Sequence, residues 1–370
     1  MSYSFPENWS KLNVALCHDW LTGMRGGERC LELLAHGFPR APIHTLIHNR
    51  DKVSEAINAH EIRTSPLQKI PGIFKNYRWF LPFFPSAIRS FAPPDCDLLI
   101  STSHCVAKAL PHKPETKHLC YCFTPMRYAW TFHDEYLGRQ SLKRTLATPI
   151  LARLREFDRE NSAGVTRFVA ISEHVRKRIQ KFYNRDADVV YPPVDTDFFS
   201  PLLGVRGDYD LIVSALVPYK KVDLAVRAFA KIGFPLKIIG TGTEFEKLRA
   251  VAPVNVEFLG WKSDEDVREF YQRCRFLIFP GEEDFGIVPI EAQACGRPVV
   301  AFRRGGLTET IADGATGIFF DEQNEEALAD AVARAEKKRW DGGAIRRNAE
   351  RFSVQKFIDG IDAAIQACLR

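Results

Sequence analysis

Several features that would place the chain in a membrane-spanning, secreted or metal-binding class are missing from its sequence. No run of about eighteen apolar residues occurs, and the start of the chain has neither a basic nor an apolar leader region, so we expect a protein that is neither spanning nor secreted. The nine cysteines are scattered from Cys17 to Cys368 without a Cys-x2-Cys pair. This pattern indicates reduced thiols in a cytosol and argues against a zinc site. No cluster of acidic, histidine or cysteine residues has metal-ligand spacing, so we predict no metal and no bound cofactor.

The overall composition is that of an ordinary globular protein, but charge is distributed unevenly along it. At 370 residues, with 45% hydrophobic and 26% charged residues, the chain exceeds what one hydrophobic core usually supports, which predicts two domains. Residues 1–190 carry 27 Lys and Arg against 18 Asp and Glu, whereas the remainder carries 24 against 28. The first half is therefore expected to meet an anionic partner, either nucleic acid or a membrane surface. Because no nucleic-acid-binding module is recognisable, we do not predict nucleic acid as a partner.

The first half repeats a pattern of buried strand, polar or glycine-containing loop, and helix. The predicted strands cover residues 13–17, 43–47, 97–101, 119–123 and 168–171. In a parallel sheet the carboxyl ends of the strands share one edge, and the side chains expected to converge there are His18, Asp19, His104 and Arg127. Arg127 can bind a phosphate or carboxylate through two hydrogen bonds. His104 either contacts the acceptor or substrate, or has an ordinary structural role. Gly26 and Gly27, at a helix entrance, either face a diphosphate or form a plain turn.

The second half repeats the same pattern after a proline-containing linker near residue 195. Lys220 and Lys221 follow its first strand, residues 210–214. Adjacent cations are costly to bury and useful against phosphate, although a solvated turn is the alternative. Further on, Glu283 lies in a loop and Glu291 in a helix predicted for residues 285–294, and carboxylates at such a strand end suit sugar hydroxyls. Gly286 lets backbone approach a ligand closely, and the first helical turn offers N–H groups to an anion. Two glutamates eight residues apart also occur by chance in many helices.

Residues 67–91 alternate aromatic and basic side chains. Such a segment can rest in the interface of a bilayer against anionic lipid. Pro71, Pro82 and Pro85 divide it into short helices, so the alternative is a set of hinge-like pieces whose aromatic side chains belong to the core. We therefore expect either contact with a membrane or a lipid-linked acceptor, or ordinary packing.

The spacing of Glu283 and Glu291, with Phe285-Gly286 between them and Ala294-Cys-Gly-Arg-Pro-Val-Val after them, resembles the signature of the family-4 retaining glycosyltransferases. The segments Val-Pro-Tyr-Lys220, Tyr-Pro-Pro-Val-Asp195 and Thr-Pro-Met-Arg-Tyr-Ala-Trp130 extend the resemblance over nearly the whole chain, and it is close for bacterial enzymes that transfer mannose or related sugars in polysaccharide assembly. The resemblance implies an α/β fold of GT-B type. Two Rossmann-like domains, residues 1–195 and 196–351, would face a cleft that holds a sugar nucleotide, and a C-terminal helix at 352–370 would brace the first domain.

The resemblance also implies roles for individual residues. Glu283 would hold the transferred sugar, Glu291 the ribose, and Lys220 and Lys221 would neutralise the leaving diphosphate. The remaining donor contacts implied are Gly26, Gly27, Gly242, Leu259, Gly260, Trp261, Phe285, Gly286, Ile287 and Val288. The catalytic set implied is Lys220, Glu283, His104 and Arg127. Reaction would proceed with retention, without a covalent enzyme intermediate or a required metal, so that catalysis is chiefly placement of charge.

Two positions depart from the wider family. Ala215 stands where an arginine commonly precedes the phosphate lysine, and Phe123 stands where a histidine often ends a strand of the first domain. The resemblance as a whole implies a cytoplasmic hexosyltransferase at the inner face of the membrane, with GDP-mannose favoured as donor and a lipid-linked or oligosaccharide acceptor. A catalytically weakened sugar-nucleotide-binding subunit is the alternative. A Rossmann oxidoreductase is disfavoured, because no Gly-x-Gly-x-x-Gly fingerprint with a distal acid is present.

Overall fold

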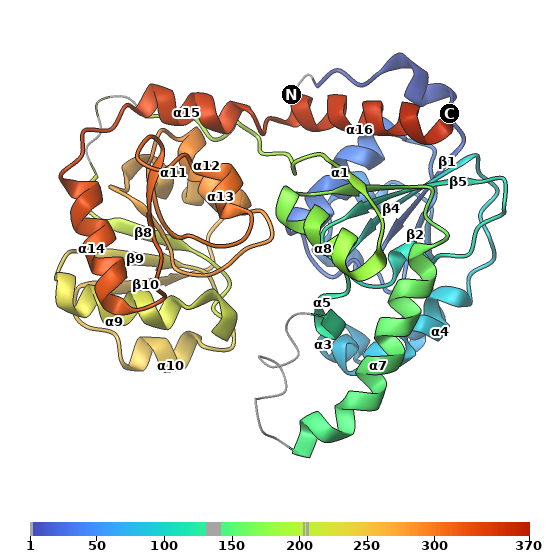
Figure 1. Ribbon diagram of the computed structural model, residues 1–370, viewed down its shortest axis with the longest axis horizontal. Helices are drawn as coiled ribbons and strands as arrows, with labels where there is room; N and C mark the ends of the chain where they lie inside the picture. Colours follow the sequence, from blue (N-terminus) through green and yellow to red (C-terminus); the bar gives the residue numbers. More distant parts are fainter. Residues whose placement is uncertain (1–2, 131–141, 203, 205–206) are drawn as a thin grey trace. The chain divides into compact units, whose positions relative to one another are not determined.

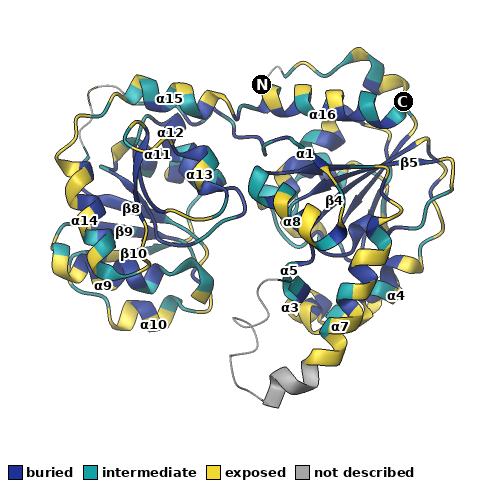
Figure 2. Ribbon diagram, in the orientation of Figure 1, coloured by how far each residue is buried: buried dark blue, intermediate teal, exposed yellow. Residues whose placement is uncertain are grey.

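The computed structural model describes residues 3–130, 142–202, 204 and 207–370. Its contacts divide the chain into two units, one comprising Met1–Pro192 with Phe357–Arg370 and the other Pro193–Lys356. Each unit contains one parallel sheet with helices on both faces (Figure 1). Most strand residues are buried, while the helices expose their outer faces (Figure 2).

The first unit is built on a seven-stranded parallel sheet of order β3-β2-β1-β4-β5-β6-β7. Its strands are β1 (Val14–His18), β2 (Ile43–Thr45), β3 (Ile62–Thr64), β4 (Leu98–Ser103), β5 (Lys117–Cys122), β6 (Arg167–Ala170) and β7 (Ala187–Val189). All residues of β1 and β4 are buried, as expected of strands covered on both faces. Cys120 and Cys122 of β5 are free thiols buried in the core.

Helices α1 (Gly26–Gly37) and α16 (Val354–Leu369) lie on one side of this sheet, and α4 (Phe84–Arg89) and α7 (Leu142–Ser162) on the other (Figure 1). The last helix is joined to the first unit by the indole of Trp9, which donates to Asp362 over 2.8 Å. Phe357 adds an edge contact to Tyr121, with ring centroids 5.5 Å apart. The shorter helices are α2 (Glu55–Asn58), α3 (Ile73–Asn76), α5 (Arg127–Trp130) and α8 (Glu173–Tyr183). The side chain of Ser172 caps the start of α8.

The segment 67–91 folds into short helical pieces, as its prolines predict. The pieces are the 3-10 helices η3 (Pro66–Lys69) and η4 (Tyr77–Phe83) and the α-helices α3 and α4. Tyr77 and Phe84 are buried in the core, whereas Trp79 and Phe83 are 84% and 60% exposed. The core interpretation is therefore confirmed for Tyr77 and Phe84, whereas contact of the exposed aromatic side chains with a membrane stays a prediction.

The second unit is built on a six-stranded parallel sheet of order β10-β9-β8-β11-β12-β13. Its strands are β8 (Asp210–Val213), β9 (Leu236–Ile239), β10 (Val256–Gly260), β11 (Leu277–Phe279), β12 (Val299–Phe302) and β13 (Gly317–Phe320). The helices are α9 (Val222–Ile232), α10 (Phe245–Ala250), α11 (Asp264–Arg273), α12 (Ile287–Ala294), α13 (Leu307–Thr310), α14 (Glu325–Glu336) and α15 (Gly342–Glu350). Apolar side chains of α9, α14 and the central strands form one buried cluster.

Candidate functional site

The loop after β8 and the loop after β11 bring together two residues predicted for donor binding. Lys220 ends the 3-10 helix η6 (Pro218–Lys220), and its ammonium forms an ion pair with the Glu283 carboxylate. Their side chains are only 16% and 18% exposed. The ammonium also lies 5.9 Å from the centre of the Phe279 ring, at the end of β11. The arrangement is a partly desolvated ion pair at the carboxyl edge of a parallel sheet, where such folds bind ligands.

Glycines let the backbones of this edge approach one another closely. A Cβ atom on Gly281 would lie 2.9 Å from the carbonyl oxygen of Lys220, and one on Gly305 would overlap the carbonyl oxygen of Glu283. The Gly306 N–H donates to that same oxygen over 2.8 Å. The backbone of the loop that carries Glu283 is therefore fixed by its neighbours.

The helix that follows begins later than the sequence predicts. Phe285 is buried against Phe352, with ring centroids 5.6 Å apart, and Gly286 caps α12 with a φ of 100° that side chains rarely adopt. The helix therefore starts at Ile287 rather than at 285. The Phe285 side chain belongs to the core, while half-buried Ile287 and Val288 present the first backbone N–H groups of the helix.

Glu291 lies about one turn farther along α12 and is half-buried. Its Oε2 accepts a hydrogen bond of 2.8 Å from the hydroxyl of Tyr271 in α11. Tyr271 is fully buried and was not a predicted site residue. The tyrosine could not be found by motif, because its only signal is a contact between two helices.

The other predicted donor residues lie at the ends of β9 and β10. Gly242 fits against the loop after β8, where a Cβ atom would overlap the Leu216 carbonyl oxygen. Gly260 ends β10 with a φ of 68°, next to half-buried Leu259, and Trp261 follows with 76% of its surface exposed. Lys221 has a left-handed conformation, with φ 55°, and caps α9. These residues share the sheet edge with the Lys220–Glu283 pair, since all follow carboxyl ends of the same parallel sheet.

In the first unit, Asp19 organises the corresponding edge. Its carboxylate is fully buried and accepts backbone N–H bonds of 2.6–2.9 Å from residues 104–107, and His104 Nδ1 lies 3.0 Å from Oδ2. Burial alone would raise the pKa of Asp19, but the charge and hydrogen bonds of His104 outweigh it and hold this pKa well below its ordinary value. Because Nδ1 contacts Asp19, Nε2 is the ring nitrogen of His104 that can contact a ligand. The His104 side chain is 28% exposed.

His18 lies beside this cluster but is buried. Its Nδ1 is 2.7 Å from the Thr102 hydroxyl, and its Nε2 is 4.0 Å from Glu28. Burial lowers the pKa of His18, although Glu28 opposes the shift, which favours the neutral imidazole. His18 therefore supports the edge, and His104 is the histidine that a ligand can reach.

The predicted convergence in the first unit holds for His18, Asp19 and His104. The ring of Phe123 lies 6.3 Å from both imidazole rings, and a Cβ atom on Gly27 would lie 3.2 Å from it. Gly26 and Gly27 begin α1, which follows β1 at the same edge. Arg127 begins α5 after β5 and is half-buried.

Metal and membrane-spanning features are absent from the described part of the chain. Within residues 3–130, 142–202, 204 and 207–370, no three His, Cys, Asp or Glu side chains are grouped so that they could hold a metal ion. None of the helices in these ranges combines the length and apolar composition needed to cross a bilayer.

Comparison with known proteins connects both halves of the chain to one class of enzyme. Residues 24–198 match the family model described as Glycosyltransferase Family 4, and residues 195–352 match that of Glycosyl transferases group 1. An uncharacterized glycosyltransferase of Methanocaldococcus jannaschii is 30% identical over 218 residues, which cover 56% of this chain and 61% of that protein. A D-inositol 3-phosphate glycosyltransferase of Acidothermus cellulolyticus is 33% identical over 205 residues, 46% of each chain. The chain thus spans about half the length of the curated relatives it matches.

Solved structures resemble the whole chain. Anabaena HepE in complex with UDP and glucose aligns over 96% of this chain and 100% of its own, with a TM-score of 0.66 and 17% identity. The lipopolysaccharide outer core galactosyltransferase WaaB, in its apo form, aligns over 96% and 99%, with a TM-score of 0.68 and 18% identity. These likenesses confirm the predicted α/β fold of GT-B type. The two family models, which together run from residue 24 to residue 352, establish that the chain belongs to the family-4 glycosyltransferases.

Proposed function

We propose that the protein is a retaining glycosyltransferase that moves a hexose from a nucleoside-diphosphate sugar to a lipid-linked or glycan acceptor in polysaccharide or cell-surface glycan synthesis. The observation that carries this proposal is the ion pair between Lys220 and Glu283, held at one sheet edge with Glu291 in the adjoining helix. A cation, a sugar-binding carboxylate and a ribose-binding carboxylate are the groups that a sugar nucleotide requires. GDP-mannose is the favoured donor because of the sequence resemblance.

The donor diphosphate is assigned to Lys220, Lys221 and the first N–H groups of α12. An anion there gains from the ammonium charges and from the positive end of the helix. Negative charge grows on the diphosphate as the glycosidic bond breaks, so fixed cations stabilise the transition state more than the bound donor. We propose that these groups suffice without a metal ion.

The first unit is assigned to the acceptor side. His104 is partly exposed and fixed through Nδ1 by Asp19, which leaves Nε2 to contact an acceptor hydroxyl. Arg127 is the candidate for an acidic group of the acceptor, because a guanidinium binds phosphate or carboxylate with two parallel hydrogen bonds.

A surface of the first unit supports peripheral attachment to an anionic membrane at its cytoplasmic face. Residues 62–94 contain five basic residues and no acidic one, and η4 exposes the side chains of Trp79 and Phe83. Aromatic side chains beside cations match the interface of a bilayer that contains anionic lipid.

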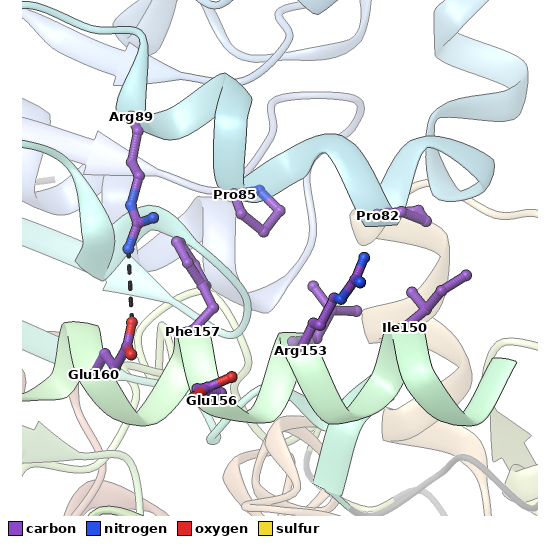
Figure 3. Close-up of a pocket in the computed structure, with 9 residues that line it drawn as sticks. Pro82, Pro85, Arg89, Ile150, Arg153, Glu156, Phe157 and Glu160 are labelled. Carbon is purple, nitrogen blue, oxygen red and sulfur yellow. Dashed lines mark ion pairs between the residues drawn. The ribbon is translucent and has the colours of Figure 1, made fainter.

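A groove of about 320 Å³ lies beside this surface, between α4 and α7 (Figure 3). Pro82, Pro85 and Ile150 supply apolar walls, and Arg153 points into it from α7. At its other end Arg89 forms an ion pair with Glu160, 3.9 Å apart, and lies over the Phe157 ring. The groove adjoins the aromatic and basic surface, and its apolar walls make it the candidate recess for part of a lipid chain.

Donor binding and turnover test the proposal in two steps. Thermal unfolding is measured with millimolar ADP, CDP, GDP or UDP, since a ligand that binds only the native state raises the melting temperature. The protein is then incubated with GDP-mannose and a lipid-linked acceptor, and the anomeric configuration of the product is determined by NMR. Stabilisation by at least one nucleoside diphosphate, followed by transfer with retention, is expected; absence of any nucleotide-dependent stabilisation would contradict the proposal.

A catalytically weakened sugar-nucleotide-binding subunit is the second candidate. Ala215 provides no arginine in the diphosphate loop, and Phe123 provides no imidazole at the end of β5. Nucleotide binding without transfer to any acceptor, and without donor hydrolysis, would favour this second function.

A further inference from the structure

Glu291 is supported by a buried tyrosine from the neighbouring helix. The Tyr271 ring is fully buried and packs edge-on against Phe199, with ring centroids 5.8 Å apart. Its hydroxyl donates to Glu291 Oε2 over 2.8 Å. Burial, together with the adjacent carboxylate, raises the pKa of Tyr271, so the hydroxyl keeps its proton and remains a donor at neutral pH.

We propose that Tyr271 is a positioning residue, which holds the Glu291 carboxylate in the orientation that accepts hydrogen bonds from the ribose hydroxyls of the donor nucleotide. The inference rests on the proposed function, because it assigns the ribose to Glu291. A glutamate side chain has three rotatable bonds and loses rotamer freedom when a ligand fixes it. Tyr271 has already fixed it from the buried side, through a charge-assisted hydrogen bond.

The second unit offers a matched control for this contact. Tyr209 is also buried, and its hydroxyl donates over 3.0 Å to the carbonyl oxygen of Phe270, in the same helix α11. Removing either hydroxyl therefore removes one buried hydrogen bond at α11. Only the bond of Tyr271 ends on a carboxylate of the proposed site.

The test compares wild type, Tyr271→Phe and Tyr209→Phe by calorimetric titration of the full chain with GDP and UDP and with the 2′-deoxy and 3′-deoxy form of each. For wild type, loss of the ribose hydroxyl that meets Glu291 should weaken binding about tenfold or more, as for a hydrogen bond to a charged group. For Tyr271→Phe, the affinity for the parent nucleotide should be about tenfold weaker than in wild type. Within this variant, the deoxy nucleotide should bind only about twofold more weakly than the parent nucleotide. Tyr209→Phe should keep the wild-type values.

A purely structural role for Tyr271 predicts a different outcome. In that case both variants lose thermal stability, but the ratio of parent to deoxy affinity in Tyr271→Phe equals that of wild type, and the inference is overturned. Failure of wild type to bind either nucleotide is a separate result, because it refutes the proposed donor site and, with it, the role of Tyr271.

Discussion

Replacement of Asp19 by asparagine should destabilise the first unit strongly. Oδ1 accepts N–H bonds from residues 106 and 107, and Oδ2 accepts those of 104 and 105 as well as the contact of 3.0 Å with His104 Nδ1. An amide group has one acceptor oxygen, so in either orientation at least two buried N–H groups lose their partner. Each such loss costs about 1–3 kcal/mol, which predicts about 2–6 kcal/mol in total.

The expected dependence on pH follows from the direction of the pKa shift. The pKa of Asp19 is lower in the folded protein than in the unfolded chain, so its ionised carboxylate stabilises the fold above the unfolded value of about 3.9. That stabilisation is lost as the pH falls from this value through the lower folded pKa. The difference between wild type and Asp19→Asn should therefore be largest near neutral pH and shrink in acid.

The measurements are urea unfolding at several pH values and amide hydrogen exchange of residues 104–107. Asp95→Asn is the control, because Asp95 is an exposed carboxylate whose partner, Lys113, lies 2.6 Å away and is itself on the surface. We expect little change from the control. Wild-type stability at neutral pH in Asp19→Asn, with unchanged protection of residues 104–107, would refute the account of Asp19 as the anchor of the His104 loop.

Four further predictions concern the donor site and the membrane surface. Lys220→Ala should lower kcat/KM by about 10² to 10³, chiefly through kcat, since it removes a preorganised charge from the leaving group; steady-state kinetics that show a wild-type rate would make the loop an ordinary turn. Glu291→Gln should weaken donor binding by about 1.5–3 kcal/mol in calorimetry, and unchanged affinity would refute the ribose assignment. Transfer activity should persist in excess EDTA, and a loss of activity that only a divalent ion restores would refute metal independence. Replacing Lys69, Lys75 and Arg78 by serine together should weaken the affinity for anionic vesicles about a hundredfold, at about 1 kcal/mol per cation, as measured by co-sedimentation. Binding to neutral vesicles and to the donor should not change, and equal co-sedimentation of variant and wild type with anionic vesicles would refute the membrane assignment.

Much of the fold could be predicted because its central strands are short apolar runs. The segments at 97–101 and 299–302 form β4 and β12, whose residues are all buried. The edge strands β3 and β13 gave weaker signals. Ile62–Thr64 has three residues that are not buried, and the glycines around Gly317 were interpreted as turns although this residue begins β13.

The site was predictable only where a residue lies in a recognisable local segment. The sequence identified Lys220 and Glu283, and the structure pairs them. Sequence analysis did not identify Tyr271, because its hydrogen bond to Glu291 depends on the packing of α11 against α12. Phe285 shows the opposite case, because its place in the motif suggested a ligand contact while its side chain is buried against Phe352.

The pairing of Lys220 with Glu283 bears on the missing arginine at position 215. The Lys220 ammonium is paired with a carboxylate that is itself assigned to the donor sugar. Ala215 is exposed, so an arginine at this position would be solvated, and the partly buried pair of Lys220 and Glu283 forms without it. We infer that the donor exchanges the partners: its diphosphate replaces Glu283 beside Lys220, which frees the carboxylate to accept hydrogen bonds from the sugar. Binding of the diphosphate and release of Glu283 would then be one event, so a nucleoside monophosphate should leave the ion pair intact.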